Sequence, residues 1–361
     1  MRSFSALHAS RSAAMFSLLC LSALVSLAPT VAQARTQIPN ATPALSSPQN
    51  KVQTPASEAI SAPIAGPLTG PAPIQARPLI TDLTLKTLRV GNLSRSYFSE
   101  RSNHEQPLPL IIAFHGLGST GSVMSKYTRL TEIAESAGFM VVYPIGTGLN
   151  IDARSWNSGA CCGYARIHNI DDVGFIRALV KKLVDDGQAD ASRIYAVGFG
   201  NGGMMAYRMT VEAPELIKAV AVVSATLDVD PKLVTQARPV LHIHGTEDPY
   251  LPFLGGVPDK PMGSSSSKPL LSVPSQMQLW VKANGANPQA NVLNIPDNAN
   301  DGTSVVQFSY RTATDPEAVV LYQVKGGGMA WPGGAPSADI GGKVTANLDA
   351  SHVIVDFLGK H

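Results

Sequence analysis

The sequence predicts an α/β fold in which a mainly parallel central sheet carries helices on both faces. From residue 79 onward, short apolar runs rich in β-branched residues alternate with segments of helical periodicity. The apolar runs are nearly continuous, as in strands that are buried on both sides. Of the 361 residues, 44% are hydrophobic and 15% are charged, which is typical of a globular protein with a sizeable core.

Strands and helices are expected to alternate along the chain. The expected strands are residues 83–90, 95–100, 110–114, 139–143, 194–199, 219–224, 240–244 and 319–324. The expected helices are residues 122–137, 171–186, 202–212, 274–283 and 349–358. Gly138, Gly187 and Gly285 lie just after three of these helices, where a left-handed cap residue is commonly glycine.

Residues 1–34 have the pattern of a secretory signal peptide. Arg2 and Arg11 precede an apolar run over residues 13–27, and the small-residue cleavage pattern Ala-Gln-Ala follows at residues 32–34. The apolar run is shorter than the ~20 residues that span a bilayer. We therefore expect a secreted protein, extracellular or periplasmic, with no integral membrane segment after signal cleavage.

Residues 35–78 are rich in proline, alanine and serine and show no helical or strand period, so we expect a disordered linker. This leaves residues 79–361 as the folded domain. The 28 Lys and Arg residues nearly balance the 26 Asp and Glu residues. A nucleic-acid partner is not expected, because phosphate binding needs a concentrated basic patch.

The adjacent residues Cys161 and Cys162 are the only cysteines outside the predicted signal peptide. In an oxidising compartment they can form a vicinal disulfide, and the alternative is a pair of buried thiols beside a pocket. Two adjacent thiolates without further ligands do not provide the tetrahedral geometry of a zinc site, so no metal site is expected.

Two glycine-rich loops follow expected strands at the edge where open α/β sheets bind ligands. The segment GFGNGG at residues 198–203 lies between a strand and a helix, which is the context of the nucleophile elbow G-x-S-x-G. Gly200 stands at the nucleophile position and has no side chain that could attack a substrate. The segment HGLG at residues 115–118 is a turn that can direct backbone N–H groups at a developing oxyanion.

Two further loops carry the positions of an acid and a base. The segment HGTEDP at residues 244–249 supplies a carboxylate, Asp248 with Glu247 as the alternative, that would orient a catalytic imidazole. The chain order nucleophile, acid, histidine places the base in the last loop, at residues 326–334. Met329 stands there, and a thioether cannot accept and return a proton.

Taken together, the four loops resemble those of the polyhydroxybutyrate depolymerase-like and feruloyl esterase family of α/β-hydrolases. The resemblance extends from about residue 88 to the C-terminus and includes the segments SWN at 155–157, DDVGF at 171–175 and MMAYR at 204–208. It implies the α/β-hydrolase fold and a secreted carboxylic ester hydrolase that acts on aryl esters or short-chain polyesters. It also implies a Ser–Asp–His triad and no cofactor.

Transferred to this chain, the resemblance assigns the acid to Asp248 and the oxyanion N–H donors to Leu117 and Asn201. Where the family has its serine this chain has Gly200, and where the family has its histidine this chain has Met329. Loss of both reacting groups predicts a catalytically impaired protein, a pseudo-esterase.

Three aromatic residues, Trp156, Tyr250 and Trp331, are expected to line a mostly apolar pocket for a small-molecule or polymeric ester-like ligand, with packing in the core as the alternative. His242 and His244 are expected to be structural. Two other functions compete with the pseudo-esterase: an active ester hydrolase that uses relocated catalytic groups, and a non-catalytic envelope interaction protein.

Overall fold

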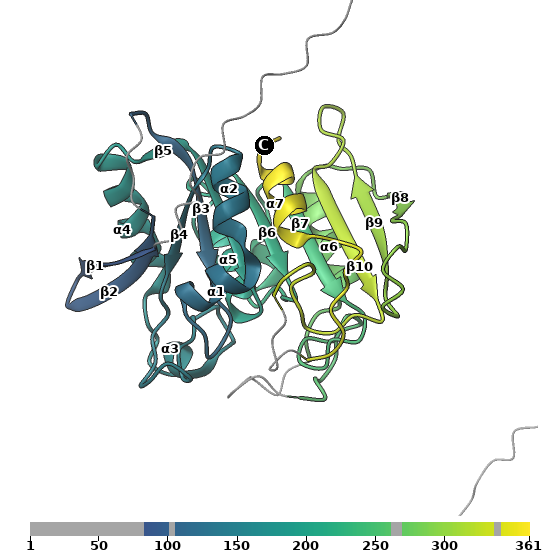
Figure 1. The fold of residues 1–361 in the computed structure, drawn as a ribbon, viewed down its shortest axis with the longest axis horizontal. Helices are drawn as coiled ribbons and strands as arrows, with labels where there is room; N and C mark the ends of the chain where they lie inside the picture. Colours follow the sequence, from purple (N-terminus) through teal and green to yellow (C-terminus); the bar gives the residue numbers. More distant parts are fainter. Residues whose placement is uncertain (1–82, 101–104, 261–268, 336–340) are drawn as a thin grey trace, which may run out of the picture. The chain divides into compact units, whose positions relative to one another are not determined.

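The computed structural model describes residues 83–100, 105–260, 269–335 and 341–361 (Figure 1). The predicted signal peptide and linker lie outside the described residues and stay predictions. Within the described ranges, no helix has both the length and the apolar character that a membrane span requires.

The described residues form a ten-stranded sheet in the order β1-β2-β4-β3-β5-β6-β7-β10-β9-β8. Its six central strands are parallel: β4 (Met140–Pro144), β3 (Leu108–Phe114), β5 (Ala189–Phe199), β6 (Ala219–Val223), β7 (Val240–Gly245) and β10 (Val319–Lys325). Two antiparallel strands extend each edge: β1 (Thr84–Val90) and β2 (Leu93–Ser99), and β9 (Ser304–Tyr310) and β8 (Asn291–Asn294). The predicted α/β fold with a mainly parallel sheet is confirmed.

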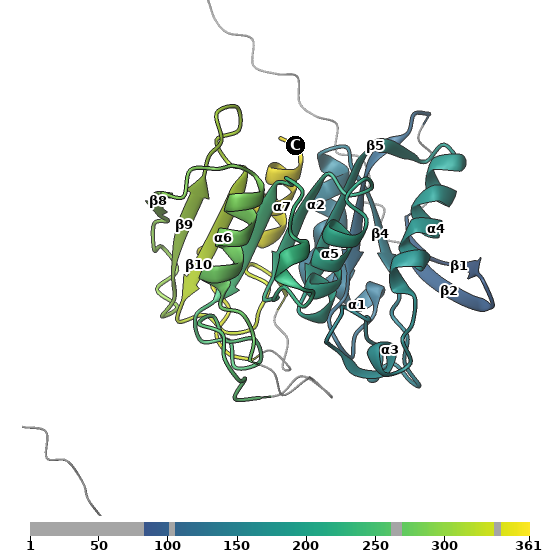
Figure 2. The ribbon, with the colours of Figure 1, turned by 180° about the vertical axis from the view of Figure 1, so that it is seen from behind.

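Helices cover both faces of the sheet (Figures 1 and 2). One face carries α1 (Gly121–Thr128), α2 (Leu130–Ser136) and α7 (Ala350–Leu358). The other carries α4 (Asp172–Asp185), α5 (Asn201–Glu212) and α6 (Val273–Ala283). Successive residues of a strand point to opposite faces. Accordingly, Ile111 packs in one core with Leu130, and Ile112 packs in the other with Phe175.

Several elements differ from the expectation. The predicted helix 122–137 is two helices, because Arg129 between them has a φ of 56°. Strands β8 and β9 and the short helix α3 (Gly163–Ile167) were not predicted.

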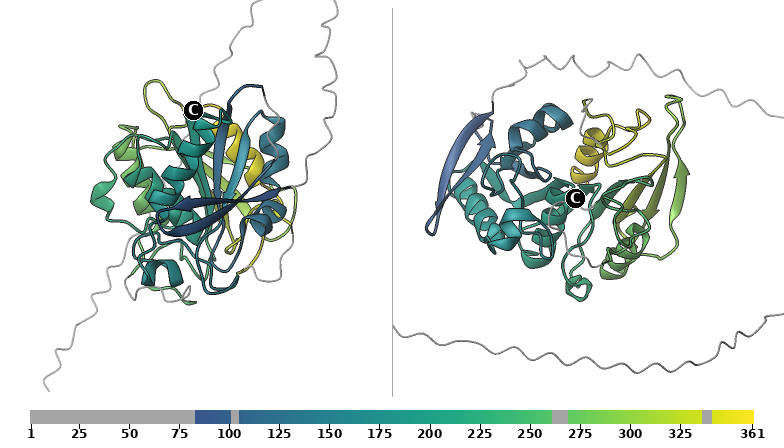
Figure 3. Two further views of the ribbon diagram at one scale, coloured as in Figure 1. Left: turned by 90° about the vertical axis from the view of Figure 1, so that its left-hand side faces the viewer. Right: turned by 90° about the horizontal axis from the view of Figure 1, so that it is seen from below.

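The carboxyl ends of the parallel strands lie along the lower edge of the sheet in Figure 1, next to α3. The right panel of Figure 3 views the molecule from this side. The loops that follow β3, β5, β7 and β10 are all at this edge, so the fold brings the four glycine-rich or acidic loops together.

Candidate active site

The turn between β5 and α5 has the backbone of a nucleophile elbow. Gly200 has φ 55° and ψ −122°, a conformation that glycine adopts at little cost. A Cβ at Gly202 would collide with the carbonyl oxygens of Phe114 and His115. The start of α5 therefore packs backbone to backbone against the end of β3, which brings the elbow to the predicted oxyanion turn.

His115 fixes the shape of that turn. Its Nδ1 lies 2.8 Å from the Gly116 carbonyl oxygen, and its Nε2 lies 3.0 Å from the Gly146 nitrogen, whose N–H it accepts. Complete burial lowers the pKa of His115 to about 4, so the ring is neutral, with its proton on Nδ1. The Leu117 N–H on the same turn donates to no acceptor within the described residues, which leaves it free for a ligand oxygen.

The Asn201 side chain ties the elbow to the neighbouring loop. Its Oδ1 accepts from the Trp156 N–H at 2.7 Å, and its Nδ2 donates to the Trp156 oxygen at 3.1 Å and to Ser158 Oγ at 3.3 Å. The backbone N–H of Asn201 belongs to the first turn of α5, where helical N–H groups have no partner within the helix. The side chain is thus structural, and the backbone N–H is in the position of an oxyanion donor.

Asp248 is a buried carboxyl group with one unpartnered oxygen. Its Oδ1 accepts from the N–H groups of Tyr250 at 2.9 Å and Leu251 at 2.8 Å. Its Oδ2 has no hydrogen-bond partner among the described residues and lies 3.4 Å from His244 Nε2. Burial raises the pKa of Asp248, and His244, the two N–H donors and the Ser224 hydroxyl offset part of this rise. Glu247, the alternative acid, is exposed.

Met329 lies directly beside Gly200. A Cβ at Gly200 would lie 2.6 Å from Met329 Cε, and apart from the chain neighbours Phe199 and Asn201 no other described residue would have an atom within 4 Å of it. The loops of the predicted acid and base are also in contact, because the Glu247 N–H donates to the Gly327 oxygen at 2.8 Å. The structure therefore brings together the residues at the three predicted triad positions.

His242 and His244 belong to a buried hydrogen-bond chain. His244 Nε2 lies 2.7 Å from the Leu251 carbonyl oxygen, which can only accept, so this nitrogen carries a proton. His244 Nδ1 then accepts from His242 Nε2 at 2.9 Å, and His242 Nδ1 accepts from the Tyr207 hydroxyl at 2.8 Å. Burial lowers the pKa of both histidines. All four ring nitrogens are engaged, so neither ring is available as a base.

The remaining described histidines are also away from the elbow. His168 stacks on Tyr164 in the α3 region, and His352 pairs with Asp349 at the start of α7. Both rings are exposed. Within the described residues, no histidine atom would come within 4 Å of a Cβ at Gly200.

Both predicted pocket tryptophans are packing residues in this structure. Trp156 is 0% exposed and donates from Nε1 to the His115 oxygen at 2.9 Å. Trp331 is also 0% exposed and donates from Nε1 to Ser351 Oγ at 3.0 Å. With both rings inside the core, the expectation that they line a ligand pocket is corrected. Tyr250 is partly exposed, next to Asp248, and stays a candidate.

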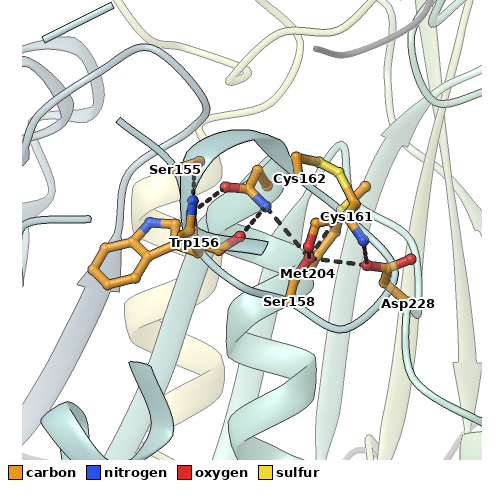
Figure 4. The surroundings of a disulfide bond; sticks show 9 residues. Ser155, Trp156, Ser158, Cys161, Cys162, Met204 and Asp228 are labelled. Atoms are coloured by element: carbon orange, nitrogen blue, oxygen red, sulfur yellow. Dashed lines mark hydrogen bonds between the residues drawn. A yellow bond between two sulfur atoms is a disulfide. The ribbon is translucent and has the colours of Figure 1, made fainter. Parts of the chain in front are cut away.

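Cys161 and Cys162 form a disulfide (Figure 4). The Cys161 N–H donates to Asp228 Oδ2 at 2.5 Å, and burial raises the pKa of Asp228 to about 6. The disulfide belongs to a small apolar group, which we name the sulfur-rich cluster. Its buried members are Cys161, Cys162, Met204 and Leu251, and its partly buried members are Leu117, Tyr250, Leu270 and Met329.

A model of the phospholipase/carboxylesterase family matches residues 165–271. Over 325 residues, the chain is 31% identical to the putative esterase NocK of Nocardia uniformis subsp. tsuyamanensis, with 85% of this chain and 92% of that protein covered. This chain belongs to the esterase-like α/β-hydrolase family. It is also 32% identical over 115 residues to feruloyl esterase B of Neurospora crassa, which covers 32% of this chain and 38% of that protein.

An acetyl xylan esterase from Aspergillus awamori has a similar fold, with a TM-score of 0.50 at 14% identity over 68% of this chain and 94% of that one.

The sequence predicted the loops of the candidate site but not the side chains that hold these loops in place. The Asn201 amide, the Asp228 carboxyl group and the Met204 thioether act through contacts between distant segments. Of these three residues, only Asn201 could have been found from the sequence, because it directly follows Gly200 in the predicted elbow motif.

Proposed function

We propose that this chain is an exported esterase-like α/β-hydrolase that has lost ester hydrolysis and uses its former active site to bind an ester-like aromatic or acyl ligand. The contact between Met329 and Gly200 carries the proposal. A thioether methyl group occupies the space that a nucleophile at position 200 would need, and the same methionine replaces the base.

What is kept at the site supports binding without chemistry. The elbow backbone, the Leu117 N–H and the first-turn N–H of Asn201 do not depend on a nucleophile, and they can hold a ligand oxygen. Asp248 retains its two backbone donors, and the imidazole beside it, His244, is held neutral by burial and donates to the Leu251 oxygen. Export is supported by the signal-like pattern of residues 1–34.

A relocated catalytic centre is the competing function, and the histidine contacts argue against it. His115, His242 and His244 each use both ring nitrogens in buried hydrogen bonds. A serine without a nearby base is a poor nucleophile at neutral pH.

The proposal is tested with purified mature protein, short acyl esters and methyl hydroxycinnamates. We expect calorimetric binding at millimolar concentration and at most a trace of hydrolysis, because oxyanion donors alone leave roughly 10³–10⁴-fold acceleration over water. Turnover on the order of 1 s⁻¹ or more would overturn it. Treatment with a fluorophosphonate, followed by peptide mass spectrometry, should find no modified serine, whereas a stoichiometric adduct would identify a relocated nucleophile.

A further inference from the structure

We infer that the Cys161–Cys162 disulfide is a redox-sensitive clamp on the elbow, which a small dithiol opens by reducing it, so that residues 158–162 loosen from Asn201. The inference goes beyond the proposed function and does not depend on it, because it rests on contacts of the disulfide loop rather than on what the site binds.

The disulfide is placed for a local role. It joins two adjacent residues, so it links no separate elements of the fold. A disulfide stabilises a protein mainly by closing a loop of the unfolded chain, and a bridge between chain neighbours closes almost none. Both cysteines are buried in the sulfur-rich cluster, which also contains Met204 and Met329. The bond therefore acts on the loop that carries it and on the side chains packed against it.

Hydrogen bonds tie this loop to the elbow. The Cys161 oxygen accepts from the Ser158 N–H at 2.9 Å and lies 2.7 Å from Ser158 Oγ. The Asn201 amide nitrogen donates to Ser158 Oγ at 3.3 Å and to the Trp156 oxygen at 3.1 Å. The Trp156 oxygen also accepts from the Cys162 N–H at 3.3 Å. Each cysteine backbone is thus connected to the first residue of α5, and a shift of the loop reaches the elbow.

Asp228 also holds the loop (Figure 4). Its Oδ2 accepts from the Cys161 N–H at 2.5 Å and lies 3.0 Å from Ser158 Oγ, and its backbone oxygen accepts from the Ala160 N–H at 3.3 Å. Gly159, between these contacts, is exposed. Movement of the loop away from Asp228 therefore opens a path to the sulfur of Cys161, which is 5% exposed whereas Cys162 is 0% exposed.

The reaction is thiol–disulfide exchange. One thiolate of the dithiol attacks the Cys161 sulfur, the bond between the two cysteines breaks, and Cys162 leaves as a thiolate. The second thiol of the reductant then attacks the mixed disulfide and releases Cys161. Two electrons pass from the dithiol to the protein, two protons end on the cysteine thiols, and the reductant leaves as a cyclic disulfide.

Reduction should displace the loop because two thiols that are no longer bonded need more room than a disulfide. The surrounding interior is close-packed, so this room comes from the part of the surroundings that can move. The loop at residues 158–162 is held by the hydrogen bonds to Asp228 and Asn201 and has an exposed side at Gly159. Its displacement weakens the contacts that hold the start of α5.

The test uses the mature chain from residue 35, whose only cysteines are Cys161 and Cys162. Dithiothreitol should add two hydrogens to the intact mass. Amide hydrogen exchange at residues 158–162 and 204–206 should become faster by about tenfold or more, because local opening sets the exchange rate. Exchange in α7, on the other face of the sheet, should not change, and oxidised glutathione should restore the original rates.

Two variants separate the bond from the hydrogen bonds. Cys161→Ser/Cys162→Ser should show the fast exchange of the reduced chain without reductant, and dithiothreitol should not change it further. Ser158→Ala keeps the disulfide but removes one link to Asn201, so reduction should still affect residues 158–162 and should affect residues 204–206 less. If the double serine variant does not fold, the oxidised and reduced native chains decide the question.

Three results would overturn the inference. If dithiothreitol does not reduce the folded chain, the disulfide is not a redox site. If reduction leaves exchange at residues 204–206 unchanged, the loop does not act on the elbow. If reduction speeds exchange throughout the sheet, the disulfide supports the whole fold and is no local clamp. None of these results bears on the proposed function, which ester hydrolysis and ligand binding decide.

Discussion

Gly200 and Met329 constrain each other through direct contact. Any side chain at position 200 must meet the Met329 methyl group and must also tolerate a φ of 55°. Strain of this kind costs a residue other than glycine roughly 1–3 kcal/mol. A side chain added at position 200 therefore carries the backbone strain and must also displace the flexible end of Met329.

We predict that Gly200→Ala destabilises the native chain more than it destabilises a Met329→Ala chain. The backbone strain is the same in both, but only the native chain must also displace the methionine methyl group. The double-mutant cycle consists of the native chain, Gly200→Ala, Met329→Ala and the variant with both substitutions. Urea denaturation of these four proteins should give a coupling free energy on the order of 0.5–1 kcal/mol between the two positions. Additive effects within measurement error would show that the two side chains do not share this space.

Asp248 is a buried carboxyl group, and the imidazole beside it, His244, is already bonded to the Leu251 oxygen and to His242. Because burial raises the folded-state pKa of Asp248, the contribution of this group to stability is fully present below its unfolded pKa of about 3.9. That contribution is lost as the pH rises through the folded pKa. Ionisation of the buried Asp248 therefore lowers the free energy of unfolding of the native protein at neutral pH.

Asp248→Asn should therefore stabilise the protein, and the gain should grow as the pH rises. The amide oxygen keeps the bonds from the Tyr250 and Leu251 N–H groups, and the neutral amide removes the cost of ionising a buried carboxyl group. Thermal denaturation between pH 4 and pH 8 measures this. A loss of stability at pH 8 would contradict the predicted cost of an ionised, buried Asp248.

Asp190→Asn is the control, because this substitution should lower the stability at neutral pH, whereas Asp248→Asn should raise it. Hydrogen bonds from Ser192 and then Arg193 lower the pKa of Asp190 to about 2. This carboxylate contributes stability above its unfolded pKa, and the contribution is lost as the pH falls through the folded pKa. The Asn variant should accordingly be slightly less stable than the native chain at neutral pH, with the difference vanishing near pH 2.

At the scale of elements, the start of α5 shows why the elbow survives without a nucleophile. A Cβ at Gly198 would meet the backbone of Gly202, and one at Gly202 would meet the backbone at the end of β3. These glycines allow the helix, the strand and the oxyanion turn to approach closely. These close contacts do not depend on a serine between the two glycines.

We predict that Gly202→Ala costs at least about 2 kcal/mol of unfolding free energy, toward the upper end of the 1–3 kcal/mol typical of overpacking, because backbone atoms cannot move aside. The matched control is Gly359→Ala after α7. Gly359 has a φ of −67°, and its nearest atom to an added Cβ is at 3.4 Å, so little change is expected. Chemical denaturation compares the two. Equal stability of both variants would show that this close approach is not needed.

The sequence located the strands that are buried and continuous, and missed elements that depend on their neighbours. All four residues of β8 are exposed, so no apolar pattern indicated a strand, and β8 forms by pairing with β9. The predicted helix 122–137 carries no glycine or proline at its break. The left-handed Arg129 and the bond from the Leu130 N–H to Thr128 Oγ1 at 3.2 Å interrupt it.

The sequence predicted only part of the candidate site, because some of its features depend on residues that are distant in the sequence. Loop motifs and chain order predicted the positions of Gly200, Asp248 and Met329, and the structure brings the three loops together, whereas the roles of these residues stay predictions. Burial of Trp156 and Trp331 depends on contacts across the fold, to His115 and Ser351, that no local pattern encodes. Aromatic residues in glycine-rich loops therefore looked like pocket residues when they are core residues.

At the scale of the whole molecule, the sheet, its two helical layers and the loops at the carboxyl edge form an α/β-hydrolase fold, and we propose that the reacting groups of this fold are lost. Triad members act as a unit, so restoring one of them should restore little. Gly200→Ser alone would place a hydroxyl group against a thioether, and Met329→His alone would give Asp248 an imidazole with no nucleophile to activate.

The most direct test is ester hydrolysis by the native chain, the two single variants and Gly200→Ser/Met329→His. The account predicts that only the double variant gains esterase activity, by several powers of ten, and that adding Asp248→Ala removes most of the gain. If the native chain or Gly200→Ser alone hydrolyses short acyl esters as fast as the double variant, another group supplies the base and the account is wrong.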